Sequence, residues 1–172
     1  LGVGYADWAT AANDASTTYT NPAGLTHLAG QQIMVNPMGL IGTTRFTGSA
    51  QTPAYPFPVP VIETGGASSQ IAAFFPSFFY AKPLTDTFSF GVGATTPFGL
   101  GTKYHHQSLV RYAATRSQVV GFDIAASLGA KLTDSISIGA GFDALRLGFT
   151  LNNIYGPPLS FPDAGLENHL SG

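Results

Sequence analysis

The chain has 172 residues, about the size of one domain. Only 9% of them are charged, against about 25% in ordinary soluble domains, and a net charge of -2 offers no concentrated basic face for nucleic acid. The absence of cysteine excludes disulfides, thiolate catalysis and zinc-thiolate sites, and no apolar run approaches the roughly 18 residues of a membrane helix.

The order of patterns along the chain predicts a segment of turns followed by strands. Residues 1–30 are rich in Ala, Thr, Asn and Gly with little alternation, which is typical of short helical turns and loops. After them the period of two expected for strands dominates. We predict strands near Gln32–Thr47, Ile71–Ala81, Thr87–Thr96, Ser117–Lys131 and Ser135–Leu151. The proline-rich stretch between the first two, TPAYPFPVPVIETGGASS, is predicted to be a long loop.

The third predicted strand lies in TFSFGVGATTPFGLGTKY and contains an interruption. Its first residues alternate between apolar side chains and small or polar ones. Pro97 then has no N–H to give to a strand ladder, and Gly99 follows it. We therefore predict that this strand breaks near Pro97.

An internal echo predicts two equivalent turns. LTDTFSFGVG at Leu84–Gly93 returns as LTDSISIGAG at Leu132–Gly141, with six of ten positions identical. Each Thr-Asp pair is typical of a tight polar turn that opens a strand. Two turns separated by two antiparallel strands lie on the same side of a sheet, and the connections on the other side are longer here. Short turns on one side and long loops on the other indicate an outer-membrane barrel.

The two faces of the fourth predicted strand support this interpretation. An apolar face opposes a face of small or polar residues: Val120, Phe122, Ile124, Ala126, Leu128 and Ala130 against Gly121, Asp123, Ala125, Ser127 and Gly129. A strand of about 10 residues, tilted by about 40°, spans about 25 Å, close to the apolar band of such barrels. A soluble sandwich also alternates, but it usually places Lys and Glu on its wet face.

Several stretches together resemble the FadL family of outer-membrane transporters for long-chain fatty acids and other hydrophobic compounds. They are ANDASTTYTNPAGLTHLAG from Ala12, FFPSFFYAKPLTDTFSFGVGATTPFGLGTKY from Phe74, and then VRYAATRSQV and LTDSISIGAGFDAL. The resemblance runs nearly end to end and is weakest in the proline-rich stretch and after Asn152. The Asn-Pro-Ala tripeptide and the Pro-Phe-Gly-Leu run are specific only in combination.

The resemblance implies an all-β fold, an antiparallel transmembrane β-barrel of fourteen strands plugged by an N-terminal hatch. Residues 1–30 would form part of the hatch, and residues 31–172 the first part of the barrel, about five strands that end in a long extracellular loop. The chain would then be a fragment without the signal peptide, the start of the hatch and the later strands. It also implies passive, energy-independent uptake of long-chain fatty acids or hydrocarbons by a monomer in the outer membrane of a Gram-negative bacterium.

The Asn21-Pro22-Ala23 tripeptide has two compatible interpretations. The residues alone predict that Asn21 caps a helix whose first turn begins with Pro22. The resemblance implies a hatch motif that faces the interrupted strand.

The residues at the interruption, Thr96, Pro97, Phe98 and Gly99, match the position at which the family opens the barrel wall sideways. An apolar substrate would leave there into the bilayer without crossing water, where each exposed CH₂ costs about 0.8 kcal/mol. The alternative is an ordinary strand end at the lipid interface.

The segment IYGPPLSFPDAGLENHL is predicted to be a solvent-facing loop, and exposed apolar clusters often mark binding surfaces. The resemblance implies a hydrophobic capture loop formed by Ile154, Tyr155, Leu159, Phe161 and Leu166. Near Asn153 some relatives supply a basic residue for a substrate carboxylate, and this segment has none, so neutral hydrocarbons remain open as substrates.

Other functions have weaker signals. His105-His106 has no third ligand at useful spacing, so we expect no metal site, no cofactor and no catalytic residues. A general aqueous porin is the first alternative, and a secreted β-sandwich or adhesin-like binding module is the second. An outer-membrane hydrolase is the third, although no nucleophile and base stand out.

Overall fold

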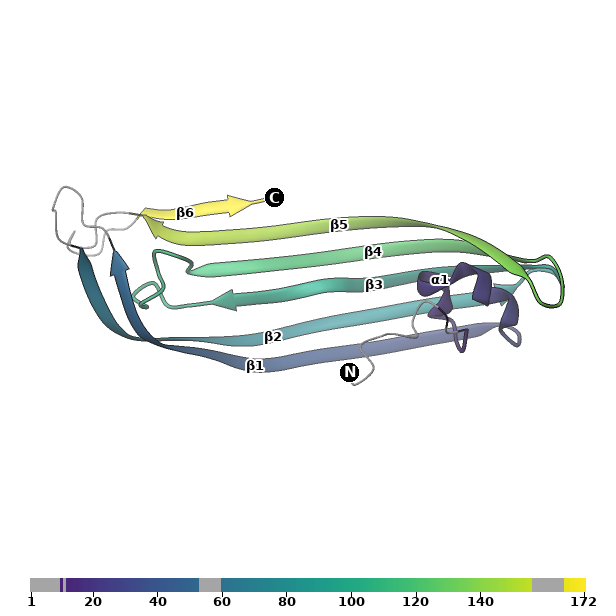
Figure 1. Ribbon diagram of the computed structural model, residues 1–172, viewed down its shortest axis with the longest axis horizontal. Helices are drawn as coiled ribbons and strands as arrows, with labels where there is room; N and C mark the ends of the chain where they lie inside the picture. Colours follow the sequence, from purple (N-terminus) through teal and green to yellow (C-terminus); the bar gives the residue numbers. More distant parts are fainter. Residues whose placement is uncertain (1–9, 11, 53–59, 156–165) are drawn as a thin grey trace. The chain divides into compact units, whose positions relative to one another are not determined.

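The computed structural model describes residues 10, 12–52, 60–155 and 166–172, and its strands form one antiparallel sheet in sequence order (Figure 1). The strands are β1 (Gln32–Thr52), β2 (Val61–Pro83), β3 (Phe88–Lys103), β4 (Arg116–Lys131), β5 (Ser137–Tyr155) and β6 (Leu166–Ser171). This confirms the predicted all-β antiparallel fold class. The sixth strand lies within the segment that was predicted to be a loop.

Two predicted boundaries are wrong. β2 begins at Val61, so the second half of the proline-rich stretch is strand, because the run of prolines ends at Pro60 and the strand-forming residues Val61, Ile62 and Thr64 follow it. β3 continues through Pro97 to Lys103. Proline fixes a φ that extended backbone tolerates, so it removes one hydrogen-bond donor from the ladder without ending the strand.

The two echo turns have the same hydrogen bonds. In the first, the amides of Leu84 and Thr85 donate to the Phe88 carbonyl; in the second, the amides of Leu132 and Thr133 donate to the Ile136 carbonyl. The Thr85 hydroxyl oxygen accepts from the Phe88 amide (3.0 Å), as the Thr133 hydroxyl oxygen accepts from the Ile136 amide (3.1 Å). The Lys131 amide donates to the Thr87 carbonyl (2.8 Å), so the two turns lie side by side, as predicted (Figure 1).

Residues 12–30, here called the N-terminal segment, contain helix α1 (Thr17–Thr20) and the 3₁₀ helix η1 (Pro22–His27). The Asn21 side chain accepts from the Gly24 amide (3.4 Å), and Pro22 occupies the first turn of η1, which confirms the predicted cap. Across the described ranges, no helix combines the length and the apolar character needed to cross a membrane.

The chain forms two compact units. The first comprises Leu1–Met38, Phe75–Pro97 and Gly121–Arg146, and the second comprises Gly39–Phe74, Phe98–Val120 and Leu147–Gly172. The core of the first unit joins the N-terminal segment to β2: Ala15, Leu25, Leu28, Phe79 and Ala81, with Tyr19 and Met34 packed against it. The N-terminal segment is therefore fixed by apolar contacts to one face of the sheet.

The faces of β4 follow the predicted alternation. The small or polar set from Gly121 to Gly129 is buried, and the apolar set from Phe122 to Leu128 is exposed. Large apolar side chains also point outward from β5, where Ile138 is 54% and Phe142 is 72% exposed. An apolar face of this extent is unfavourable in water and suits contact with lipid.

Candidate functional site

A pocket of about 490 Å³ lies between the N-terminal segment and the first three strands, within the first unit. Its apolar lining consists of Met34, Met38, Phe75, Phe79 and Pro97, and its polar lining of Ser16, Tyr19, Asn36, Ser77, Thr95 and Thr96. The Ser77 and Thr95 hydroxyls share a hydrogen bond across the β2–β3 pair (2.9 Å). The volume and the few polar groups on apolar walls are typical of a small-molecule site.

Two of the four predicted gate residues, Thr96 and Pro97, line this pocket. β2 and β3 pair from Pro83 opposite Ser89 to Phe78 opposite Ala94. Continuing this register by two residues places Pro76 of β2 opposite Thr96. Pro76 and Pro97, two residues without an N–H, therefore lie at adjacent levels of neighbouring strands. Alternate residues of an antiparallel pair bond across it, so Pro76 removes a donor from the β2–β3 ladder, whereas the nitrogen of Pro97 faces β4.

The other two predicted gate residues, Phe98 and Gly99, belong to the second unit and continue β3. Phe98 is 51% exposed. Buried and less buried residues alternate regularly in β3 only as far as Gly93, so the irregular part of the strand begins before Thr96, the first of the predicted gate residues.

The predicted hatch motif rests on glycines of the sheet. Pro22 and Ala23 lie so close to Gly139 of β5 that a Cβ there would collide with the backbone of both residues. A Cβ at Gly129 of β4 would lie 2.5 Å from the Pro22 carbonyl oxygen. The residues of the N-terminal segment that share the pocket with Thr96 and Pro97 are instead Ser16 and Tyr19.

Gly91 of β3 completes this surface, because a Cβ there would collide with the Thr18 side chain. We call Gly91, Gly129 and Gly139 the glycine seat. The Thr26 hydroxyl donates to the Ser137 hydroxyl (2.8 Å) at the start of β5 and adds a polar contact beside the seat. Only residues without a side chain allow the N-terminal segment to approach the strands this closely.

A buried hydrogen bond also joins α1 to β4. The Tyr19 hydroxyl bonds to the Asp123 carboxylate, and Asp123 is 3% exposed. Burial, this hydrogen bond and the negative charges of Asp123 and Asp143 raise the pKa of Tyr19 above its ordinary value. Tyr19 therefore keeps its proton at neutral pH and remains a donor. The other oxygen of Asp123, Oδ1, has no hydrogen-bond partner among the described residues. The hydrogen bond from Tyr19 is therefore important for stabilising this buried carboxylate.

Tyr19→Phe should loosen the N-terminal segment, because it leaves the buried Asp123 carboxylate without this donor while the ring still packs. A hydrogen bond to a charged group contributes roughly 1.5–3 kcal/mol. We expect amide hydrogen exchange in residues 17–28 of the complete protein to accelerate by about ten- to a hundredfold. In the unchanged protein, the pKa of Tyr19 is higher in the folded state than in the unfolded state. The stabilisation of the segment by the protonated Tyr19 hydroxyl is therefore fully present below the ordinary tyrosine pKa of about 10, and it is lost as the pH rises through the pKa of the folded state. Unchanged exchange in the variant would contradict this role.

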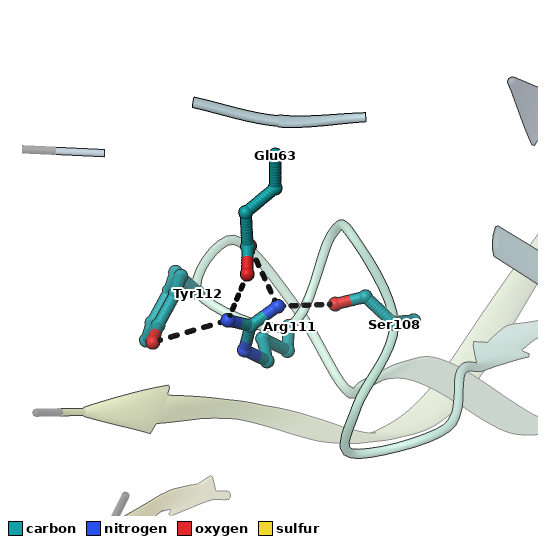
Figure 2. Close-up of polar contacts among 4 residues, drawn as sticks. All are labelled: Glu63, Ser108, Arg111 and Tyr112. Carbon is teal, nitrogen blue, oxygen red and sulfur yellow. Dashed lines mark hydrogen bonds and ion pairs between the residues drawn. The ribbon is translucent and has the colours of Figure 1, made fainter. Parts of the chain in front are cut away.

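The connection between β3 and β4, residues 104–115, is organised by a buried arginine (Figure 2). The two terminal nitrogens of Arg111 each donate to one Glu63 oxygen (2.8 Å), the bidentate geometry that guanidinium and carboxylate favour. The guanidinium also donates to the Ser108 carbonyl (3.2 Å) and lies 4.5 Å from the Tyr112 ring centroid. The bond to Glu63 raises the pKa of Arg111 above its ordinary value.

The same connection is tied to β5. The Thr115 amide donates to the Asn152 carbonyl (2.7 Å), and the Ile154 amide donates to the Arg111 carbonyl (2.9 Å). The Asn153 side chain donates to the Tyr112 carbonyl (3.2 Å). Arg111 thus brings a basic side chain into the neighbourhood of Asn153 from the β3–β4 connection. Its charge is already neutralised by the ion pair with Glu63.

The predicted capture residues are only partly in the described chain. Ile154 and Tyr155 end β5 and Leu166 begins β6, so these three lie in strands and not in the predicted loop. Ile154 is buried at 7% exposure. Leu159 and Phe161 lie outside the described residues. Substrate capture by these five residues stays a prediction.

The glycine seat, Pro76 and the Glu63–Arg111 pair were not found from the sequence. The seat left a signal, because Gly91 and Gly139 occupy the same position in the two copies of the echo, and a glycine inside a strand often marks a close approach of backbone. The ion pair left none, since its partners are 48 residues apart in sequence. In the described ranges, no three His, Cys, Asp or Glu side chains gather as metal ligands.

The long alternating strands, the apolar outer face and the segment seated on the inner face together define a membrane β-barrel wall. The family model described as "Outer membrane protein transport protein (OMPP1/FadL/TodX)" matches residues 1–169. The chain therefore belongs to this family of outer-membrane transport proteins, and its location is the outer membrane. The β-sandwich alternative is wrong.

Individual relatives agree with this assignment. A candidate outer membrane protein of Neisseria meningitidis serogroup B is 33% identical over 101 residues, 59% of this chain and 21% of that protein. Outer membrane protein P1 of Haemophilus influenzae is 25% identical over 152 residues, 84% of this chain and 33% of that protein. The crystal structure of a Pseudomonas aeruginosa FadL homologue has a TM-score of 0.74 at 19% identity, covering 92% of this chain and 41% of that one. The matched part of this chain spans 21% of the Neisseria protein and 33% of the Haemophilus protein, so it covers a third or less of either curated relative.

Proposed function

We propose that this chain is part of a protein through which hydrophobic compounds, such as long-chain fatty acids or hydrocarbons, diffuse passively across the outer membrane. The N-terminal segment acts as the hatch, within residues 1–30, and residues 31–172 form the first part of the barrel. Compounds leave the pocket sideways, between β2 and β3, at the level of Pro76 and Pro97. The observation that carries this proposal is the pocket that Thr96 and Pro97 line.

The energetics favour such a route. A twelve-carbon chain gains about 10 kcal/mol on leaving water, at about 0.8 kcal/mol per CH₂, so an exit into the periplasm would be slow. The pocket is mainly apolar, and the β2–β3 ladder beside it lacks the backbone donor of residue 76. A general aqueous porin would need an open polar lumen, whereas here the polar face of β4 is buried.

Replacing both prolines should close the proposed exit. In Pro76→Val with Pro97→Val, the change at position 76 restores the donor that the β2–β3 ladder lacks, and both valines favour extended backbone, so the ladder can continue through this level. We expect uptake of a labelled long-chain fatty acid or alkane, by cells that express the complete protein, to fall at least tenfold. Pro83→Val, at the end of β2, is the matched control and should leave uptake unchanged.

Protein abundance at the surface has to be equal in all strains for this comparison. Normal uptake by the double variant at normal abundance would refute the sideways route. Planar-bilayer conductance of the purified protein tests the remaining alternative, because a large, steady ion current would favour the porin.

A further inference from the structure

Among the described residues that line the pocket, none is charged. Its polar groups are the hydroxyls of Ser16, Tyr19, Ser77, Thr95 and Thr96 and the amide of Asn36, all neutral at physiological pH. Proteins bind carboxylates most strongly through charge-assisted hydrogen bonds from Arg or Lys, roughly twice as strong as neutral ones. The described part of the pocket offers no such donor.

A buried negative charge lies behind one residue of the pocket wall. Tyr19 lines the pocket and bonds to the buried Asp123 carboxylate, and Asp143 acts on the same hydroxyl with the same sign. An anionic ligand in the pocket would be repelled by these carboxylates and would lose its hydration without a compensating cation.

The hydroxyl pair fits a neutral polar group. Ser77 and Thr95 are 2.9 Å apart, and one of their two hydrogens lies between the oxygens. The pair therefore presents both a donor and acceptor lone pairs to a ligand. An alcohol can use both, whereas a carboxylate can only accept.

We propose that this pocket selects uncharged amphiphiles, an apolar chain or ring that carries a neutral hydroxyl or carbonyl, over carboxylates of the same length. The proposal rests on the proposed function, since it names the class of compound that the pocket on that route accepts.

The test compares 1-dodecanol with dodecanoate, which share a chain length and differ in the polar group. Both are labelled and measured by equilibrium dialysis against the complete protein in a non-ionic detergent at neutral pH. We expect 1-dodecanol to bind at least tenfold more tightly. Equal binding of the two compounds, or tighter binding of dodecanoate, would overturn the proposed selectivity but not the proposed transport function. If neither compound bound the protein and cells showed no uptake, both proposals would be overturned.

Two variants examine the cause. Asn36→Lys adds a cation to the lining at an exposed position and should improve dodecanoate binding at least tenfold, while Gln107→Lys, in the exposed β3–β4 connection, should not. Thr95→Val removes one hydroxyl of the pair at nearly constant volume and should weaken 1-dodecanol several-fold without affecting dodecane. An unchanged dodecanol-to-dodecanoate ratio in both variants would show that this pocket is not the selective site.

Discussion

Gly139→Val should lift the N-terminal segment from the strands. The backbone of Pro22 and Ala23 occupies the space that the new side chain needs, and backbone cannot rotate away as the end of a flexible side chain can. Overpacking of this kind costs about 1–3 kcal/mol. A cost of about 2 kcal/mol lowers the ratio of docked to undocked segment roughly thirtyfold.

A disulfide can report docking because the chain contains no cysteine. The hydroxyls of Thr26 and Ser137 are 2.8 Å apart, so Thr26→Cys with Ser137→Cys should form a disulfide readily when the segment is seated. We expect its yield under limiting oxidant to fall several-fold in the Gly139→Val background.

Gly39→Val is the matched control, because a Cβ at Gly39 meets nothing within 4 Å. Gly139→Ala provides a milder version should the valine prevent assembly of the barrel. If Gly139→Ala and Gly139→Val both gave the control yield in correctly inserted protein, the glycine seat would not hold the segment.

Arg111→Ala should release the connection between β3 and β4. Removing one partner of a buried ion pair costs about 3–5 kcal/mol, and the partial exposure of Glu63, whose side chain is 32% exposed, reduces this to about 2 kcal/mol. We expect the amides of Thr115 and Ile154, which bond to Asn152 and Arg111, to exchange roughly thirtyfold faster. Proteolysis within residues 104–115 should accelerate in parallel.

Arg116→Ala is the control for Arg111→Ala, since Arg116 is exposed and bonds only to Gln118 among the described residues. Arg111→Lys should be intermediate, because lysine keeps the charge but cannot make the bidentate contact. Exchange in Arg111→Ala equal to that in Arg116→Ala would mean that the backbone bonds to β5 hold the connection without the ion pair.

The predictions that the structure confirms depend on local patterns. The alternation of β4 and the Thr-Asp turns concern residues close in sequence, and both appear as predicted. The cap at Asn21 is equally local. Such patterns act through the period of the backbone and through side chains that reach their own main chain, so no knowledge of distant residues is needed.

The errors come from residues whose effect depends on their neighbours. Pro97 predicts a break when considered alone, yet paired strands tolerate one missing donor and β3 continues. Its position next to Pro76 is not visible in the sequence, because only the register of β2 against β3 brings the two prolines to adjacent levels. The pocket likewise combines residues from three strands and α1, which no spacing along the chain reveals.

The glycine seat also constrains the order of assembly. Its three members come from β3, β4 and β5, so no single hairpin contains it. The β2–β3 and β4–β5 turns are closed by short-range contacts, which cost little loop entropy and form early during folding. The N-terminal segment is translated before all of these strands, but the glycine seat that it packs against forms only after the two hairpins have paired. We therefore expect the N-terminal segment to be among the last parts of this chain to reach its native position.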